Sequence, residues 1–522
     1  LLPSTQPKDS KWFEIINASK FSHLLDQGFK LNDDGLFEDL KFTPKKALSA
    51  ENISWQRPHQ LVKNPKFISD GQSRSDIKQG FIGDCWFLAA IANLTLCENL
   101  FFKVVPMDQS FSKKHGYVGI FRFHFWQYGT WKEVIVDDLL PTIEGQHYGV
   151  SSSDPDEMWS SLLEKAYAKL HGSYEALDSG ATRNALVDLT GGLSDFIGLK
   201  NPPENLPALI KRGLEMGCFF GCAIVENSSI EYGLKFGHAY SITGFIEKII
   251  DEKWIRLIRI RNPWGNTEYC GPYSDTSKFW RIFSKKERKE INHSFDDDGE
   301  FWMEYTDFLQ LFELFDICHV YPDILANFRL QCEMDNLQKS TWTSCIFKGR
   351  MSTKKDPPLY QFTLTKPEFI QGGIMIVSLL QKYRRRSHKK NLNIGFSVMS
   401  YPNDEEKKIG DSYFAPIREI SMSFIENETC DNETYAVQPR IYQKPKKSKV
   451  LRASRAVKCA RKKFKKRNSQ AEQKTKFIIR VYTNMTIESE HGTIEICEKS
   501  FYPDAQPEVL NGTTKPSDLM HK

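Results

Sequence analysis

The sequence QGFIGDCW, residues 79–86, runs directly into FLAAIANLTL, and this junction decides the fold of the first part of the chain. Residues 84–96 contain no Pro or Gly and are rich in Ala and Leu, so they predict a buried helix. Gly80 and Gly83, just before it, allow the chain to turn tightly. Cys85 therefore falls in the first turn of the helix, where free backbone N–H groups favour a negative charge.

A cysteine in this place is a candidate nucleophile, because thiolate is the reactive form and a helix N-terminus stabilises it. Gln79, six residues upstream, could direct its side-chain amide at the oxygen of a carbonyl under attack. The backbone N–H of Cys85 would be the second donor of this oxyanion hole. Taken alone, a buried cysteine at a helix start is more often structural than catalytic.

A base and an orienting residue for this thiol occur farther along the chain. His238 lies in FGHAY, where Gly237 and other small neighbours leave room for an imidazole, and Asn262 lies in RNPWG after an apolar strand. The order Cys, His, Asn is that of papain-type hydrolases. Asn262 would accept from one ring nitrogen and leave the other to face the thiol, while Trp264 would cover that bond from water. In the alternative interpretation, the histidine only ends a strand and the asparagine only makes a turn before proline.

Composition excludes several classes of protein. The 522 residues suggest about three domains, and 40% apolar with 26% charged residues allow an ordinary core. The net charge of +5 is too small to indicate nucleic-acid binding. Thirteen Lys or Arg and no acid lie within residues 444–467, so the remaining chain carries −8. This basic strip is most simply a solvated insertion, or else a surface for anionic lipid.

Cysteine usage and the chain start indicate a reducing compartment, and the cytoplasm is expected. The eleven cysteines are scattered and form no CxxC, so zinc-ribbon and thioredoxin motifs are absent. The first residues lack the charged-then-apolar order of a secretory signal. The longest apolar run, residues 374–380, is far shorter than the ~20 residues that span a bilayer.

The remaining pattern predicts an α+β protein. Residues 119–137 alternate around a Tyr-Gly turn, as in a β-hairpin whose aromatic stripe is core, and residues 158–171 predict a helix. The pair Asp137-Asp138 is interpreted as part of a turn. Residues 238–245 and 254–260 predict two strands. Beyond about residue 324, short strands with turn signals predict an antiparallel β-sandwich, for example residues 374–380, 394–399 and 477–482.

Seven blocks of the chain resemble the calpain cysteine proteases, in calpain order. They are QGFIGDCWFLAAIANLTL, FRFHFWQYGTWKEVIVDDLLPT, LLEKAYAKLHGSYEAL, LTGGL, GHAYSITG, IRIRNPWGNTEY and DDDGEFWM. The resemblance implies a two-lobed, papain-like protease core followed by a calpain-type β-sandwich. The implied parts are an N-terminal segment (residues 1–68), a lobe with Cys85 (69–180) and a lobe with His238 and Asn262 (181–322). A sandwich with a basic insertion at 444–473 (323–500) and a tail (501–522) follow.

The resemblance also implies two Ca²⁺ sites made of hard oxygen ligands. In the first lobe it assigns the carbonyls of Ser69 and Gly71 and the carboxylates of Asp76 and Glu157. In the second lobe it assigns the backbone carbonyl of Asp296 and four carboxylates, those of Glu268, Asp275, Asp298 and Glu300. Without the resemblance, the acidic run at 296–300 is equally compatible with a solvated loop. Arg74 is expected to pair with Glu300 and so to couple the two sites.

The expected function is that of an intracellular, calcium-dependent cysteine endopeptidase acting on protein substrates. One alternative is a transglutaminase-like acyl transferase, although Asp is usual there where this chain has Asn262. The other alternative is a non-catalytic calcium- and lipid-binding adaptor of the same fold. No Asp-x-Asp-x-Asp-Gly loop with its distant Glu follows residue 330, so pairing with a small calcium-binding subunit is not expected.

Overall fold

The computed structural model describes residues 28–225, 232–250, 252–291, 298–320, 342–365, 373–382, 390–402, 405–426, 433–442 and 473–497. They form two compact units, one made of the described residues up to 320 and the other of those from 342 to 497. Several predicted features lie outside the described residues: residues 1–27, Asp296, the basic segment 444–473 apart from Gln473, and the tail 501–522. No helix in the described part of the chain is long and apolar enough to cross a bilayer.

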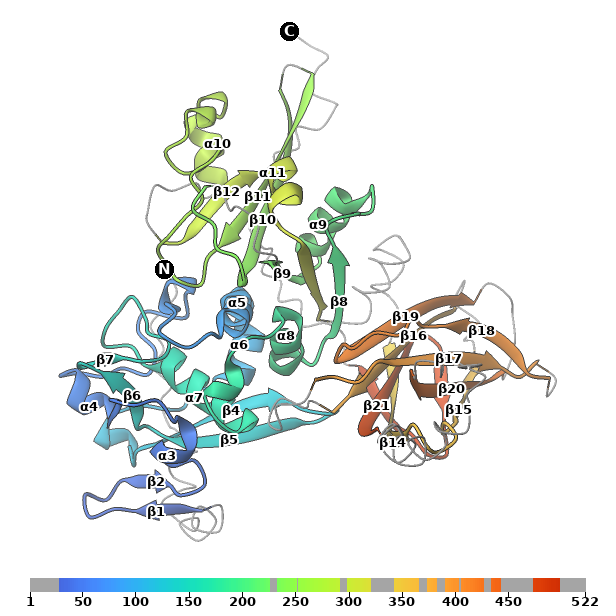
Figure 1. Ribbon diagram of the computed structural model, residues 1–522, viewed down its shortest axis with the longest axis horizontal. Coiled ribbons are helices and arrows are strands. Elements are labelled where there is room, and N and C mark those ends of the chain that lie inside the picture. The colour runs from blue at the N-terminus through green and yellow to red at the C-terminus, as the bar shows by residue number, and fades with distance from the viewer. Residues whose placement is uncertain are drawn as a thin grey trace, which may run out of the picture. The chain divides into compact units, whose positions relative to one another are not determined.

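The first unit is built around α5, Cys85–Leu94, whose ten residues are all buried. Its Phe87 ring stacks on Tyr167 of α7, Trp159–His171, with centroids 4.0 Å apart. Figure 1 shows α5 between the strands of a large sheet and α7. The predicted helix is therefore confirmed, and its burial on all sides explains why the sequence is apolar around the whole circumference.

The predicted hairpin is also confirmed, as β4, Ile120–Trp126, and β5, Trp131–Asp137. Tyr128 and Gly129 at its tip have φ values of 54° and 80°. Positive φ at both central residues is typical of the tight turn that matches the twist of two antiparallel strands. Alternate side chains of β4 are fully buried, which confirms the aromatic stripe as core: Phe121, Phe123 and Phe125.

The two acids at the end of β5, Asp137 within the strand and Asp138 after it, do more than form a turn. Asp137 accepts from the Lys165 ammonium of α7, and Asp138 accepts from the Arg57 guanidinium and the Tyr117 hydroxyl. Both carboxylates are buried, and a buried charge is tolerated only when it is paired. They therefore tie the end of the hairpin to α7 and to the chain segment before α5.

Smaller elements surround this core. Those of the first unit's helical half are β1 Phe29–Leu31, β2 Phe37–Asp39, α3 Pro44–Ala47, β3 Ser54–Gln56, α4 Pro58–Leu61, η1 Arg74–Asp76, α6 Glu98–Val104, η2 Lys113–His115, β6 Leu140–Ile143, β7 Gln146–His147, η3 Glu175–Leu177 and α8 Thr182–Thr190.

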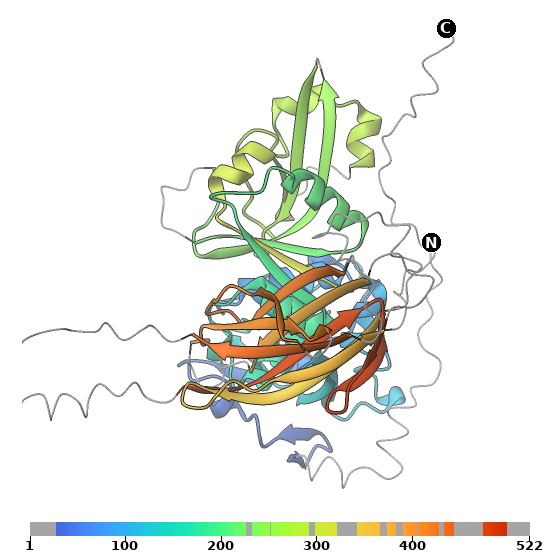
Figure 2. The same ribbon diagram turned by 90° about the vertical axis from the view of Figure 1, so that its right-hand side faces the viewer.

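The other half of the first unit is a six-stranded sheet in the order β12-β11-β10-β9-β13-β8, with every pair antiparallel. Its long hairpin β10–β11 covers both of the strands predicted there, and it projects from the sheet in Figure 2. The strands and nearby helices are β8 Leu193–Gly198, α9 Leu206–Glu215, β9 Phe219–Ile224, β10 His238–Ile250, β11 Lys253–Arg261, η4 Lys278–Ile282, α10 Lys285–Glu290, β12 Glu300–Glu304, α11 Tyr305–Leu311 and β13 Leu314–His319.

The second unit contains two five-stranded antiparallel sheets, which confirms the predicted sandwich and the α+β class. The orders are β19-β16-β21-β14-β23 and β18-β17-β20-β15-β22. Apolar side chains of both sheets form one core. The strands are β14 Trp342–Ser352, β15 Tyr360–Thr365, β16 Gly373–Gln381, β17 Ile394–Ser400, β18 Lys407–Asp411, β19 Glu419–Glu426, β20 Glu433–Ile441, β21 Lys474–Thr483, β22 Thr486–Glu488 and β23 Thr493–Cys497.

A buried ion pair links three neighbouring strands of the first of these sheets. The Arg480 guanidinium of β21 donates to the Glu419 carboxylate of β19, and the Ser378 hydroxyl of β16 donates to the same oxygen. Both charged side chains are almost completely inaccessible to solvent. The pair therefore helps to fix the pairing register of these strands, because a shift in register would leave a buried charge without its partner.

We predict that Glu419→Ala lowers the free energy of unfolding of the second unit by about 3–5 kcal/mol, because the Arg480 charge would stay buried without a partner. Amide hydrogen exchange in peptides of β16 and β21 would measure the loss. Asp411→Ala breaks an exposed pair with Lys408 and should cost no more than about 1 kcal/mol. Equal effects of the two substitutions would contradict the prediction.

Candidate active site

Cys85 is the first residue of α5 and is held there by a closely packed loop. Neither Gly80 nor Gly83 has a positive φ. A Cβ on Gly80 would lie 2.2 Å from the carbonyl oxygen of Gly149, and a Cβ on Gly83 would lie 2.2 Å from Asp178 Oδ1. A positive φ is therefore not the reason for either glycine. At Gly80 the neighbouring backbone leaves no space for a side chain, whereas at Gly83 the close atom belongs to the side chain of Asp178.

His238 and Asn262 meet at one end of the six-stranded sheet. His238 begins β10 and Asn262 follows β11, and these strands pair antiparallel with Ser241 opposite Arg261. His238 Nε2 donates to Asn262 Oδ1 over 2.8 Å. Asn262 Nδ2 donates to Thr267 O over 2.9 Å, which sets the orientation of the amide and hence makes its oxygen the acceptor. The proton then sits on Nε2, so the other ring nitrogen, Nδ1, is free to act as a base.

The thiol contacts the backbone next to the imidazole-bearing residue, across the two halves of the first unit. The backbone N–H of Ala239, the residue after His238, donates to Cys85 Sγ over 3.4 Å. The sulfur of α5 therefore lies directly beside the start of the strand that carries the imidazole. Cys85, His238 and Asn262, which are distant in sequence, thus lie in one constellation; that they act as a catalytic triad stays a prediction.

Two aromatic rings enclose the imidazole. The Trp264 ring lies 5.0 Å from that of His238, and the Tyr240 ring contacts it edge-on at 4.8 Å. Trp264 therefore covers the histidine, as predicted, while Tyr240 was not anticipated. Gly237 has a φ of +64°, and a Cβ there would meet nothing within 4 Å. Its predicted role of leaving room is thus wrong, because the backbone conformation, and not the space, requires glycine.

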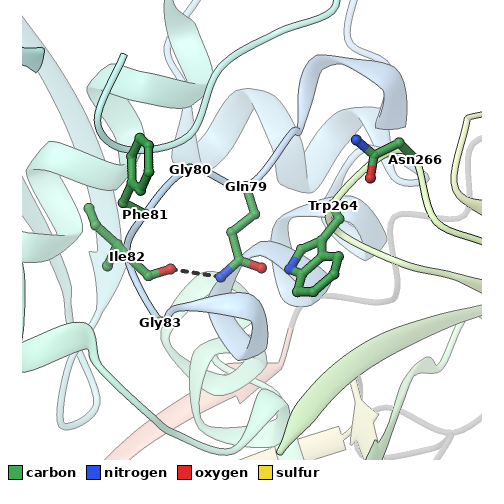
Figure 3. A pocket seen from close by; sticks show the side chains of 7 residues that line it. All are labelled: Gln79, Gly80, Phe81, Ile82, Gly83, Trp264 and Asn266. Atoms are coloured by element: carbon green, nitrogen blue, oxygen red, sulfur yellow. Dashed lines mark hydrogen bonds between the residues drawn. The ribbon is translucent and has the colours of Figure 1, made fainter. Parts of the chain in front are cut away.

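A cavity of about 410 Å³ opens beside this constellation. Figure 3 shows the Gln79 side chain next to the Trp264 ring, with Phe81 and Ile82 on the other side of Gln79. Gln79 Nε2 donates to the carbonyl of Ile82 over 2.7 Å, so the predicted oxyanion donor is engaged within its own loop. The amide carries a second hydrogen, which remains for a substrate oxygen. The lining residues are Gln79, Gly80, Phe81, Ile82, Gly83, Trp264 and Asn266.

Burial controls the protonation of both reactive groups. It raises the pKa of the Cys85 thiol to about 11; the Ala239 amide opposes this effect and the Asp84 charge adds to it. Burial also lowers the pKa of His238 to about 4, opposed by the bond to Asn262 and aided by the Lys235 charge. The expected thiolate is therefore not favoured by the helix start alone, since desolvation is the larger effect. Each group by itself is neutral at pH 7.

The first group of predicted metal ligands includes two buried carboxyls that contact each other. Asp76 and Glu157 lie within hydrogen-bonding contact, and burial raises the pKa of Glu157 to about 7. Glu157 also accepts from the Ser69 N–H over 2.7 Å. Gly71, in the same loop, has a φ of +92°. Like-charged oxygens held this close together are the kind of environment that a hard cation neutralises.

The second group gathers three of its predicted carboxyls. Burial raises the pKa of Asp275 to about 8, and the charges of Glu268 and Asp298 add to the effect. Glu268 Oε1 accepts from Gly299 N over 2.9 Å. Asp296 lies outside the described residues. Within the described ranges, no three His, Cys, Asp or Glu side chains are already arranged to hold a metal ion.

The predicted pair of Arg74 with Glu300 is present. Arg74 lies in η1 and Glu300 begins β12, so the ion pair joins the two halves of the unit. The Thr243 hydroxyl also donates to Glu300, over 2.5 Å. Arg261 was missed from the sequence: its Nη2 donates across the same boundary to Ile77 O over 3.0 Å. Its place directly before Asn262 was the signal, since a charged residue ending a buried strand needs a partner.

Comparison with known proteins relates both units to one family. The model for "Calpain family cysteine protease" matches residues 24–319, and that for "Calpain large subunit, domain III" matches residues 348–482. Calpain clp-1 of Caenorhabditis elegans is 38% identical, covering 94% of this chain and 62% of the relative. Calpain-A of Drosophila melanogaster is 42% identical over 72% of this chain and 48% of the relative. Calpain-8 of Rattus norvegicus is 41% identical over 68% of this chain and 53% of the relative. The chain thus spans about half to three-fifths of these relatives' lengths.

We predict a stability effect from the buried imidazole. The pKa of His238 is about 4 in the folded chain and about 6.5 in an unfolded one. Between these values the unfolded chain binds the extra proton, so the free energy of unfolding falls by about 3 kcal/mol as pH drops from about 6.5 to about 4. In urea titrations across this range, His238→Gln should lack this loss, whereas His115→Gln, at an exposed position, should retain it. Parallel curves for wild type and His238→Gln would contradict the prediction.

Proposed function

Since the chain belongs to the calpain family of cysteine proteases, we propose that it is a calcium-dependent endopeptidase that cuts protein substrates at a limited number of sites. The observation that carries this proposal is the contact of Cys85 Sγ with the backbone beside His238, whose ring is oriented by Asn262. A thiol, a base beside it and an amide that orients the base are sufficient for nucleophilic cleavage of a peptide bond.

In the proposed reaction, Cys85 Sγ attacks the carbonyl carbon of the peptide bond while its proton passes to Nδ1 of His238. The C–N bond then breaks, and the imidazolium gives this proton to the departing amine, which leaves a thioester on Cys85. Water attacks the thioester and gives a proton to the imidazole. The C–S bond breaks, the proton returns to sulfur, and the carboxylic acid product is released.

The environment of the pair supports an internal proton transfer. At neutral pH the thiol and the imidazole are each neutral by themselves, because burial disfavours either charge alone. Moving the proton from sulfur to imidazole creates both charges together, and each then stabilises the other at short range. Asn262 holds Nε2, so the ring accepts the proton at the nitrogen left free for the sulfur.

The developing oxyanion has two donors close by. The backbone N–H of Cys85 is at the start of α5, where it has no partner within the helix. The second hydrogen of Gln79 Nε2 is the other donor, positioned by the bond of this amide to Ile82 O. Trp264, which lines the cavity together with Gln79, keeps water from the imidazole side where the amine departs.

Calcium fits the donor set that the chain provides. Asp76 contacts Glu157 in one half, and Asp275 contacts Glu268 in the other, where the Asp298 charge lies close by. With the oxygens of Ser69, Gly71, Asp296 and Glu300, they are proposed to hold two Ca²⁺ ions. A bound cation supplies positive charge that offsets their repulsion.

The proposed compartment is the reducing cytoplasm. Several cysteines of the described residues are free thiols, as Cys85 must be to react: Cys85, Cys97, Cys222, Cys270 and Cys345. Fractionation of cells that produce the chain would test this, and its recovery in an oxidising secretory fraction would contradict it.

The decisive experiment compares the wild type with Cys85→Ala on casein, each with excess Ca²⁺ or with chelator. We expect cleavage by the wild type with Ca²⁺ and a loss of at least about 10³-fold for the variant, because the nucleophile is removed. Chelator should abolish wild-type cleavage. Cys270→Ala, at an exposed thiol, is the matched control and should cleave normally. A folded wild type that binds Ca²⁺ without cleaving would favour a non-catalytic adaptor, and transfer of acyl groups to amines in place of hydrolysis would favour an acyl transferase.

We predict that Arg74→Ala raises the Ca²⁺ concentration needed for half-maximal cleavage several-fold, because the Glu300 carboxylate would lose the cation that ties the two halves together. A calcium titration of activity, repeated with intrinsic tryptophan fluorescence, would measure the change. Arg256→Ala breaks an ion pair within the β10–β11 hairpin and is the control. An unchanged midpoint for Arg74→Ala would count against the coupling.

A further inference from the structure

The cavity beside Cys85 has an aromatic edge that the proposed reaction does not use. Phe81 contributes to the lining of this cavity, although 68% of its surface is exposed. Its ring stacks on that of Tyr148, with centroids 5.4 Å apart and planes inclined by 22°. Tyr148 packs in turn against the buried core of the helical half, so the Phe81 ring lies on an anchored neighbour. Phe81 thus offers an exposed apolar surface at the place where a substrate would bind.

The loop that carries Phe81 is fixed by both halves of the unit. The Phe81 N–H donates to Tyr148 O over 2.8 Å, and a Cβ on Gly80 would clash with the same carbonyl oxygen. From the other half, Pro263 O accepts from the Gln79 N–H over 3.0 Å. The Phe81 ring is therefore held in place before any substrate binds, which lowers the entropy that binding costs.

The direction of the proposed reaction decides which part of a substrate occupies this cavity. His238 gives its proton to the departing amine, so the residues after the cleaved bond lie beside the imidazole and beside Trp264, whose ring is 5.0 Å from it. Trp264 and Phe81 both line the same cavity of about 410 Å³. In Figure 3 the Gln79 side chain lies next to Trp264, and Phe81 lies farther along the same loop. The amine side of a substrate therefore passes from Trp264 into a space that Phe81 also bounds.

The lining of the cavity selects against charge. The described residues that form it are glycines, side-chain amides and apolar side chains, none of which is ionisable. A charged side chain that entered would lose hydration without gaining a counter-ion, whereas an aromatic or large aliphatic side chain would gain contact with the two rings. The Lys235 ammonium lies 5.7 Å from the centroid of the Trp264 ring, and it repels a basic side chain.

We propose that Phe81 is a specificity-determining residue: together with Trp264 it binds an aromatic or large aliphatic side chain at the first or second residue after the cleaved bond. Tyr148 is a positioning residue in this arrangement, since it acts through Phe81. The inference rests on the proposed peptidase function and adds a substrate class to it, namely protein segments with such a residue on the amine side of the cleaved bond.

The test uses a peptide from casein that the full chain cleaves in the presence of Ca²⁺. Internally quenched copies of this peptide carry Phe, Leu, Gly or Lys at the first or the second residue after the cleaved bond, and kcat/KM is measured for each. At one of these two positions, the wild type should cleave the Phe and Leu peptides at least about tenfold better than the Lys peptide. Mass spectrometry of the products shows whether the same bond is cut in every peptide.

Two variants identify Phe81 as the origin of this preference. Phe81→Ala should reduce the ratio to about threefold or less by lowering kcat/KM for the Phe and Leu peptides, and should leave the Gly peptide within about twofold. Phe81→Tyr keeps the ring and should keep the ratio. Phe414→Ala is the matched control, because Phe414 is also an exposed phenylalanine beside a tyrosine ring, that of Tyr442, and is not part of the cavity lining.

Each outcome decides the proposal. Equal cleavage of all the peptides would overturn it and leave the proposed peptidase function intact, and a ratio that persists in Phe81→Ala would do the same. A purely structural role of Phe81 would lower kcat/KM for the Gly and Phe peptides alike, which also overturns the proposal. If the wild type cleaves no bond in casein, the proposed function fails, and the inference, which specifies that function, fails with it.

Discussion

The first unit depends on the contact between the start of α5 and the start of β10. The Ala239 N–H donates to the Cys85 sulfur, and this one bond joins a helix from one half of the unit to a strand from the other. A thiol and an imidazole react only when they are held within hydrogen-bonding reach. The hydrogen bonds of Arg261 to Ile77 and of Gln79 to Pro263, together with the Arg74–Glu300 pair, all lie across the same boundary. They explain why the halves meet in this register.

Buried charge is the second theme of the structure. Asp76, Glu157 and Asp275 of the proposed calcium sites are buried, although burial alone disfavours their ionised forms. By contrast, Asp137, Asp138 and Glu419 have cationic partners. The difference separates acids that stabilise the fold from acids that respond to a proton or a cation. In the second proposed calcium site Glu300 has a cationic partner as well, in Arg74.

Several sequence interpretations were right about the residue and wrong about the reason. Gly80 is required by the close approach of the backbone at Gly149, and Gly237 by its backbone angle. Cys85 lies at a helix start as predicted, but desolvation raises its pKa in spite of the helix. These reasons depend on which distant segments lie nearby, and this information is not contained in the local sequence.

The sequence alone determined the elements and the list of reactive groups. The apolar run after Cys85, the alternation around Tyr128 and Gly129, and the short strands beyond residue 342 have local causes, namely propensity, periodicity and turn chemistry. Only the tertiary structure decided that Asn262 donates to Thr267 and so offers its oxygen to His238, that Tyr240 encloses the ring, and that Phe81 stacks on Tyr148. These relations come from the packing of segments that are distant in sequence, and protonation follows burial, which a linear sequence does not specify.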